Sequence, residues 1–224
     1  MQNRQAIETT LNKLFDAERT ARRLHDDLAA MPGDVLLDVL NDAIAAAGRE
    51  SDDDEAALRL VRVASLLGEH EGPRAIDALI DVLASEHPEA RQAAGEEIES
   101  LAYERFKEVA QGIERALKRL PVGSSALPEL PYLIAEVPEP GVPKLIGQFL
   151  SHKDPDAVAA GIETLVEIGD PTNASLIEPL VGDKRTVELA DDGGEATSEV
   201  TIGELAEEAL GLLAPYEEEE DGVA

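Results

Sequence analysis

The stretch ALIDVLASEHPEA, residues 78–90, aligns without gaps with LIGQFLSHKDPDA, residues 145–157. The two stretches lie 67 residues apart, and the register continues beyond them, since it pairs Ala93 with Ala160 and Glu96 with Glu163. A spacing of 67 is close to two units of about 33 residues, a length typical of helical repeats. The sequence therefore predicts a chain built from repeated structural units.

Each stretch has the pattern of a helix, a short turn and a second helix. Pro88 and Pro155 each follow a possible N-cap residue, and a proline at the first helical position loses no hydrogen bond. After Asp154, apolar residues recur at helical spacing, with Glu163 and Glu167 on the opposite face. We therefore expect amphipathic second helices that begin at Pro88 and Pro155.

The same template, applied along the chain, predicts a long N-terminal helix over about residues 4–30 that carries an apolar stripe. We interpret residues 1–31 as a capping helix. Helical repeats then follow over residues 34–182 and 203–214. The expected pairs are 34–47 with 53–67, 73–84 with 88–101, 103–120 with 125–137, 142–151 with 155–168, and 174–181 with 203–214. Gly68 and Gly169 are expected to end two of these helices in a left-handed conformation.

The last pair is interrupted at residues 185–202, where the pattern changes to alternation. Val187 and Leu189 precede a glycine-rich turn at residues 191–194, and Val200 and Ile202 follow it. This pattern predicts an inserted β-hairpin, with a disordered acidic loop as the alternative. The charge run at residues 217–224 is interpreted as an acidic disordered tail. The sequence thus predicts an all-α fold, a right-handed α-solenoid over residues 1–216 with one hairpin.

The repeats resemble a known family. LIDVLASEHPEARQAA, residues 79–94, resembles a HEAT repeat, and LGEHEGPRA, residues 67–75, is similar to the inter-repeat loop of short bacterial HEAT-like repeats of the phycobilisome-lyase type. This resemblance implies stacked helix pairs whose second helices line a concave face. It also implies a protein partner, or, by analogy with the bilin lyases, a role in chromophore attachment.

Composition limits the possible partners. The chain has 48 acidic and 19 basic residues, a net charge of −29, so nucleic acid and anionic membranes are poor partners. There are no cysteines, which excludes disulfides and thiolate metal sites. No run approaches the ~18 apolar residues of a membrane span. We expect a soluble, cytoplasmic protein.

No pattern predicts catalytic, cofactor-binding or metal-binding residues. The four histidines lack the spacing of metal ligands, and His152 with Asp154 is interpreted as capping chemistry. The acidic run at residues 51–55 could bind calcium, but a helix N-cap with first-turn acids is the preferred interpretation. Residues 103–120 form the one net-basic segment, for which DNA binding and pairing with neighbouring acids are the alternatives.

Three equivalent glutamates are the candidate protein-binding residues. Glu96, Glu163 and Glu208 occupy matching positions in second helices and would form an acidic ridge on the concave face. A solvated surface in a salt-adapted protein is the alternative. The sequence favours a non-enzymatic scaffold or adaptor for a protein partner with basic patches. A bilin-lyase-like accessory enzyme and an acidic decoy of a nucleic-acid-binding protein remain alternatives.

Overall fold

A computed structural model describes residues 2–190 and 197–214 of the chain. It confirms a predominantly helical fold with a two-stranded antiparallel hairpin. The elements in chain order are α1 (Gln2–Ala29), α2 (Gly33–Ala47), α3 (Asp53–Gly68), α4 (Pro73–Leu83), α5 (Pro88–Arg119), α6 (Ala126–Ala135), α7 (Val142–Phe149), α8 (Pro155–Ile168), α9 (Ala174–Ile177), β1 (Thr186–Ala190), β2 (Thr197–Thr201) and α10 (Ile202–Leu213). Two short 3-10 turns, Pro171–Asn173 and Glu178–Leu180, flank α9.

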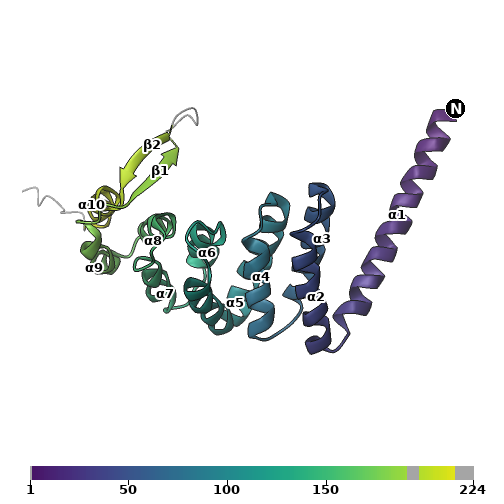
Figure 1. The fold of residues 1–224 in the computed structure, drawn as a ribbon, viewed down its shortest axis with the longest axis horizontal. Helices are drawn as coiled ribbons and strands as arrows, with labels where there is room; N and C mark the ends of the chain where they lie inside the picture. The colour runs from purple at the N-terminus through teal and green to yellow at the C-terminus, as the bar shows by residue number, and fades with distance from the viewer. Residues whose placement is uncertain (1, 191–196, 215–224) are drawn as a thin grey trace, which may run out of the picture.

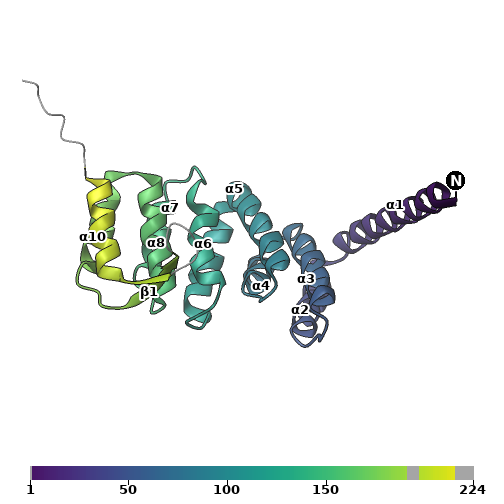
Figure 2. The same cartoon turned by 90° about the horizontal axis from the view of Figure 1, so that it is seen from above.

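The helices after α1 follow one another in a curved arrangement along the long axis (Figure 1). α3, the first half of α5, α6, α8 and α10 contact one another in that order, and we call them the second-helix row. α2, α4, the second half of α5, α7 and α9 form the first-helix row, in which α2 contacts α4 and α5 contacts α7. α6, α8 and α10 line the concave side, from which the hairpin projects, and α1 stands at the opposite end of the arrangement (Figures 1 and 2).

The core lies between the two rows and consists mainly of aliphatic side chains. Leu79, Ile80, Leu83 and Ile98 are fully buried between α4 and α5, and Phe149 is a fully buried aromatic residue of α7. The core cluster continues from α2 to α10 along the whole arrangement. Because each helix pair contributes only one layer to this cluster, each pair depends on its neighbours to bury its apolar stripe.

α5 is two helical segments joined at a kink, where Arg105 has a non-helical backbone (φ −138°, ψ 48°). The first segment belongs to the second-helix row, and the second segment returns along α4 in the first-helix row. The sequence-based division of this region near residue 102 therefore lies within three residues of the kink.

The hairpin lies where the alternation predicts it. Val187 pairs with Val200 in an antiparallel register, and the Val187 side chain is buried. Ile202 was expected to continue the second strand, but it is the first residue of α10, because Thr201 caps the helix immediately before it. The expected turn at residues 191–194 and the expected tail at residues 217–224 lie outside the described residues.

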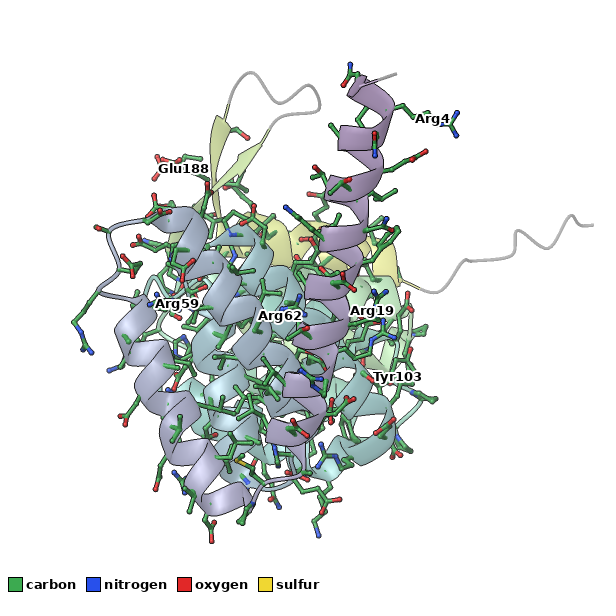
Figure 3. All side chains as sticks on the ribbon, turned by 90° about the vertical axis from the view of Figure 1, so that its right-hand side faces the viewer. Arg4, Arg19, Arg59, Arg62, Tyr103 and Glu188 are labelled. Atoms are coloured by element: carbon green, nitrogen blue, oxygen red, sulfur yellow. The ribbon has the colours of Figure 1, made fainter. Side chains whose placement is uncertain are left out.

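α1 differs from the expectation of a capping helix. Ile7, Leu11 and Leu14 on its stripe are between 45% and 60% exposed, so this part of the stripe does not cover the end of the core. Leu28 and Ala29, at the base of α1, pack against the hydrophobic core. The helix leans away from α3, and its upper turns around Arg4 extend beyond the helices behind it (Figure 3). Amphipathic periodicity predicts an apolar face but not what covers that face.

Gly68 ends α3 as expected, but not in the expected conformation. It has no positive φ and lies inside the last turn of α3, whereas Gly169 ends α8 in the expected left-handed conformation (φ 69°). A Cβ atom at Gly68 would lie 2.0 Å from Glu97 Oε2. The glycine therefore leaves room for the end of the Glu97 side chain of α5 and serves no special backbone conformation.

Candidate functional site

The structure brings two of the three candidate glutamates together. Glu163 on α8 and Glu208 on α10 line one groove of about 450 Å³ between these two helices. Glu96 lies apart on α5, where it accepts a hydrogen bond from Gln92 (2.9 Å). α6 separates α5 from α8 in the second-helix row and carries Tyr132 next to Glu163, so the acidic ridge is interrupted there.

The groove has an apolar floor, where Ile162 and Ala209 are buried, and a rim of exposed carboxylates. Its rim carries a third carboxylate, Glu167, one turn beyond Glu163. Leu212 is 67% exposed although it is a large apolar side chain. The apolar lining is contributed by Ala159, Ile162, Val166, Leu205, Ala209 and Leu212. Such a surface matches an apolar side chain flanked by cationic ones.

Tyr132 fixes the orientation of one rim carboxylate. Its hydroxyl donates a hydrogen bond to Glu163 Oε2 at 2.6 Å, across the contact between α6 and α8. Burial raises the pKa of the Tyr132 hydroxyl, and the hydrogen bond to Glu163 raises it further. The phenol therefore stays protonated and remains a donor to the carboxylate at neutral pH.

α8 is positioned by a buried cap at its N-terminus. Asp154 is only 1% exposed, and its Oδ1 accepts a hydrogen bond from the Asp156 N–H at 3.0 Å. Its Oδ2 accepts from the Gly123 N–H at 2.7 Å, which links α8 to the turn before α6. The His152 ring accepts from the Asp154 N–H through Nδ1 (3.1 Å) and lies 3.1 Å from the Leu117 carbonyl oxygen through Nε2. The capping interpretation is confirmed, and the cap also connects successive helix pairs.

α10 is positioned by a capping box and by a close backbone contact. The Thr201 hydroxyl accepts from the Glu204 N–H (3.1 Å), and the Glu204 carboxylate accepts from the Thr201 N–H (2.9 Å). A Cβ atom at Gly203 would lie 2.7 Å from the Val181 carbonyl oxygen, so glycine allows the first turn of α10 to abut this backbone. The two helices that form the groove are therefore both fixed at their N-terminal ends.

Two acids of the first-helix row form ion pairs with arginines, unlike the three carboxylates of the groove. Arg115 on α5 binds Asp77 on α4 (2.9 Å), and Arg119 pairs with Asp81 one turn further along. These contacts agree with the interpretation that the basic segment pairs with neighbouring acids. None of the ion pairs formed within the described residues involves Glu163, Glu167 or Glu208.

The acidic run at residues 51–55 has the expected structural role. Asp52 caps α3 by accepting from the Glu55 N–H (3.2 Å), and Glu55 pairs with Arg59 (2.7 Å). In the described part of the chain, no group of three acidic or histidine side chains is arranged to hold a metal ion. No helix within residues 2–190 and 197–214 combines the length and the apolar character that a membrane crossing requires.

Sequence reasoning missed several residues of the groove. Glu167 and Leu212 lie four residues after Glu163 and Glu208, so helical spacing could have identified both. Tyr132 could not be found in the same way, because prolines at positions 128 and 131 obscure the repeat pattern of α6.

Comparisons with known proteins give no family. No protein-family model matches the chain, and no curated protein sequence matches it significantly. A crystal structure of an engineered protein from the Northeast Structural Genomics Consortium shares 16% identity over 87% of this chain and 89% of its own, with a TM-score of 0.29. A similarity at this level carries no argument about fold or function.

Proposed function

We propose that the chain is a non-enzymatic adaptor, a right-handed α-solenoid of HEAT-like helix pairs that binds a cationic amphipathic helix of a protein partner. The groove between α8 and α10 is the proposed binding site. The observation that carries the proposal is the combination of an exposed apolar residue, Leu212, with three carboxylates that form no ion pair with any described residue.

The geometry supports a helical ligand. The groove runs between two neighbouring helices of the second-helix row, on the concave side. A ligand helix with apolar residues at i, i+3 and i+4 can place them on the floor while its lysines or arginines meet the rim. Glu163 and Glu167, one turn apart, then face cations that are also one turn apart.

Electrostatics favour a cationic ligand over other classes. The net charge of −29 attracts cations to the whole molecule, and the rim carboxylates direct them to the groove. Charge complementarity mainly raises the association rate, whereas contacts with the apolar floor mainly slow dissociation. The two contributions can therefore be separated experimentally.

The test uses a synthetic peptide that forms an amphipathic helix of leucine and lysine, with a scrambled peptide of identical composition. Binding and association rates are measured by fluorescence anisotropy and stopped flow. The variant with Glu163→Lys, Glu167→Lys and Glu208→Lys is expected to associate at least about tenfold more slowly at low salt. Leu212→Ser is expected to accelerate dissociation.

The matched control reverses three exposed acids outside the groove, Asp42, Glu86 and Glu178, and changes the net charge equally. Asp77 and Asp81 are unsuitable controls because they pair with arginines. Equal losses in both triple variants would show that only net charge matters. Equal binding of the scrambled peptide would contradict a role for the apolar floor.

A further inference from the structure

The N-terminal half of α1 carries an apolar stripe that lacks a partner among the described residues. Ile7, Leu11 and Leu14 follow helical spacing and are 60%, 45% and 55% exposed. The stripe continues at the base of α1, where His25 Nε2 lies 2.6 Å from Glu69 Oε1 and Leu28 packs against the core. The exposed part is therefore an extension of the face that α1 turns toward α3.

α3 presents a second apolar wall opposite this stripe. Glu18 and Ala21 of α1 share a surface hollow with Arg62 of α3, so the two helices run in the same direction. One turn further toward both N-termini, this register sets Leu14 opposite Leu58, which is 55% exposed. α1 leans away from α3, so the two helices diverge toward their N-termini, and we call the space between their apolar faces the wedge (Figure 1).

The charge of α1 distinguishes it from the rest of the chain. Residues 2–29 contain five basic and five acidic residues and are neutral, so the remaining residues carry the whole net charge of −29. A second copy of this chain would be repelled from the acidic surfaces of the molecule but not from α1. Residues 2–15 have a net charge of +1 and residues 16–29 of −1, so two α1 helices complement each other when antiparallel.

We propose that α1 is the self-association element of this protein. The α1 helix of a second copy occupies the wedge between α1 and α3, and a two-fold axis makes the arrangement reciprocal. Ile7, Leu11 and Leu14 of each copy then face the stripe of the other, and Leu58 closes the wedge from the α3 side. In a two-fold arrangement the apolar faces of α1 and α3 are buried in both copies. The buried area is therefore twice that of one copy, which helps a short helix reach the area of a stable interface.

The test measures the mass of the full chain by sedimentation velocity over a hundredfold range of protein concentration, at about 0.15 M NaCl to screen the charge of the two bodies. The wild-type chain is expected to be a dimer at the upper concentrations. The double variant Leu11→Asp, Leu14→Asp is expected to weaken self-association by more than about tenfold while its helical circular dichroism is retained, since both positions are exposed. Leu11→Ser with Leu14→Ser is expected to have the same effect without adding charge.

The control is Leu24→Asp, which adds one negative charge to the same helix. Leu24 is 54% exposed and lies about 80–140° around the helix axis from Ile7, Leu11 and Leu14. This variant is expected to remain dimeric. A wild-type chain that is monomeric at every concentration would overturn the proposal, as would a dimer that survives both double variants. Dissociation by Leu24→Asp to the same extent would also overturn it, because the stripe would then have no special role.

Discussion

Replacement of Asp154 by alanine tests whether the buried cap holds α8 in place. The Asp154 side chain is 1% exposed and accepts hydrogen bonds from Asp156 and from Gly123. Loss of an N-cap costs about 1 kcal/mol, with a range of about 0.5–2. The loss of the part-buried hydrogen bond from the Gly123 N–H to this carboxylate costs about 1.5–3 kcal/mol more, as is usual for a bond to a charged group. We therefore expect Asp154→Ala to lower the free energy of unfolding by about 2–4 kcal/mol.

Thermal unfolding followed by circular dichroism measures this loss. For a chain of this size, each kcal/mol lowers the Tm by about 2–4 °C, so the expected decrease is about 5–15 °C. The matched control is Asp52→Ala, since Asp52 is exposed and caps α3 with a single hydrogen bond to the Glu55 N–H. Its expected cost is about 0.5–1 kcal/mol. If both variants lose the same stability, the contact with Gly123 contributes nothing and the reasoning is wrong.

Three further predictions concern the core, helix packing and pH. Leu165→Asp, at a fully buried position, should cost about 3–5 kcal/mol in urea unfolding, whereas Glu167→Lys on the exposed face of the same helix should cost less than about 0.5 kcal/mol. Gly112→Ala should lose about 1–3 kcal/mol, because the new Cβ would lie 2.2 Å from a fully buried isoleucine of α4, while Gly211→Ala, which meets no atom within 4 Å, should be neutral or stabilising. Burial, assisted by neighbouring carboxylates, raises the pKa of Glu97, so the contribution of Glu97 to stability is present at low pH and is lost as the pH rises through its raised pKa. Glu97→Gln should therefore raise the Tm slightly near pH 7 and have little effect near pH 4, and a decrease in Tm at pH 7 would contradict this.

The elements that the sequence predicts well are those with local signals. Pro88 and Pro155 mark the starts of α5 and α8. A proline at the first helical position loses no hydrogen bond, and this preference does not depend on what the helix packs against. The alternation around Val187 and Val200 likewise predicts the hairpin. Successive side chains of a strand point to opposite faces of the sheet, so alternation along the sequence is enough to identify a strand.

Features that depend on packing between elements could not be predicted in this way. Gly68 carries the signal of a helix end, but its small size serves the approach of Glu97 from another helix. The equivalence of Glu163 and Glu208 predicts that they share a face, and the structure brings them into one groove. Glu96 lies outside this groove, exposed on α5, and Tyr132 of the intervening α6 lies next to Glu163.

The two proposed surfaces lie at opposite ends of the chain, which allows a joint prediction. α1 is at one end of the helical arrangement and α10 at the other, so a dimer formed through α1 would carry two separate grooves (Figure 1). On a surface densely coated with the leucine–lysine peptide, both grooves would bind and dissociation would slow, because the second binding step is intramolecular. The double variant Leu11→Asp, Leu14→Asp should lose this density-dependent slowing but bind the peptide in solution with unchanged affinity. A biosensor with high and low peptide density measures the dissociation rate at each density, and fluorescence anisotropy measures the affinity in solution. An equal dependence on density in the wild-type and variant chains would show that α1 does not link two grooves, and a loss of affinity in solution would show that α1 belongs to the groove itself.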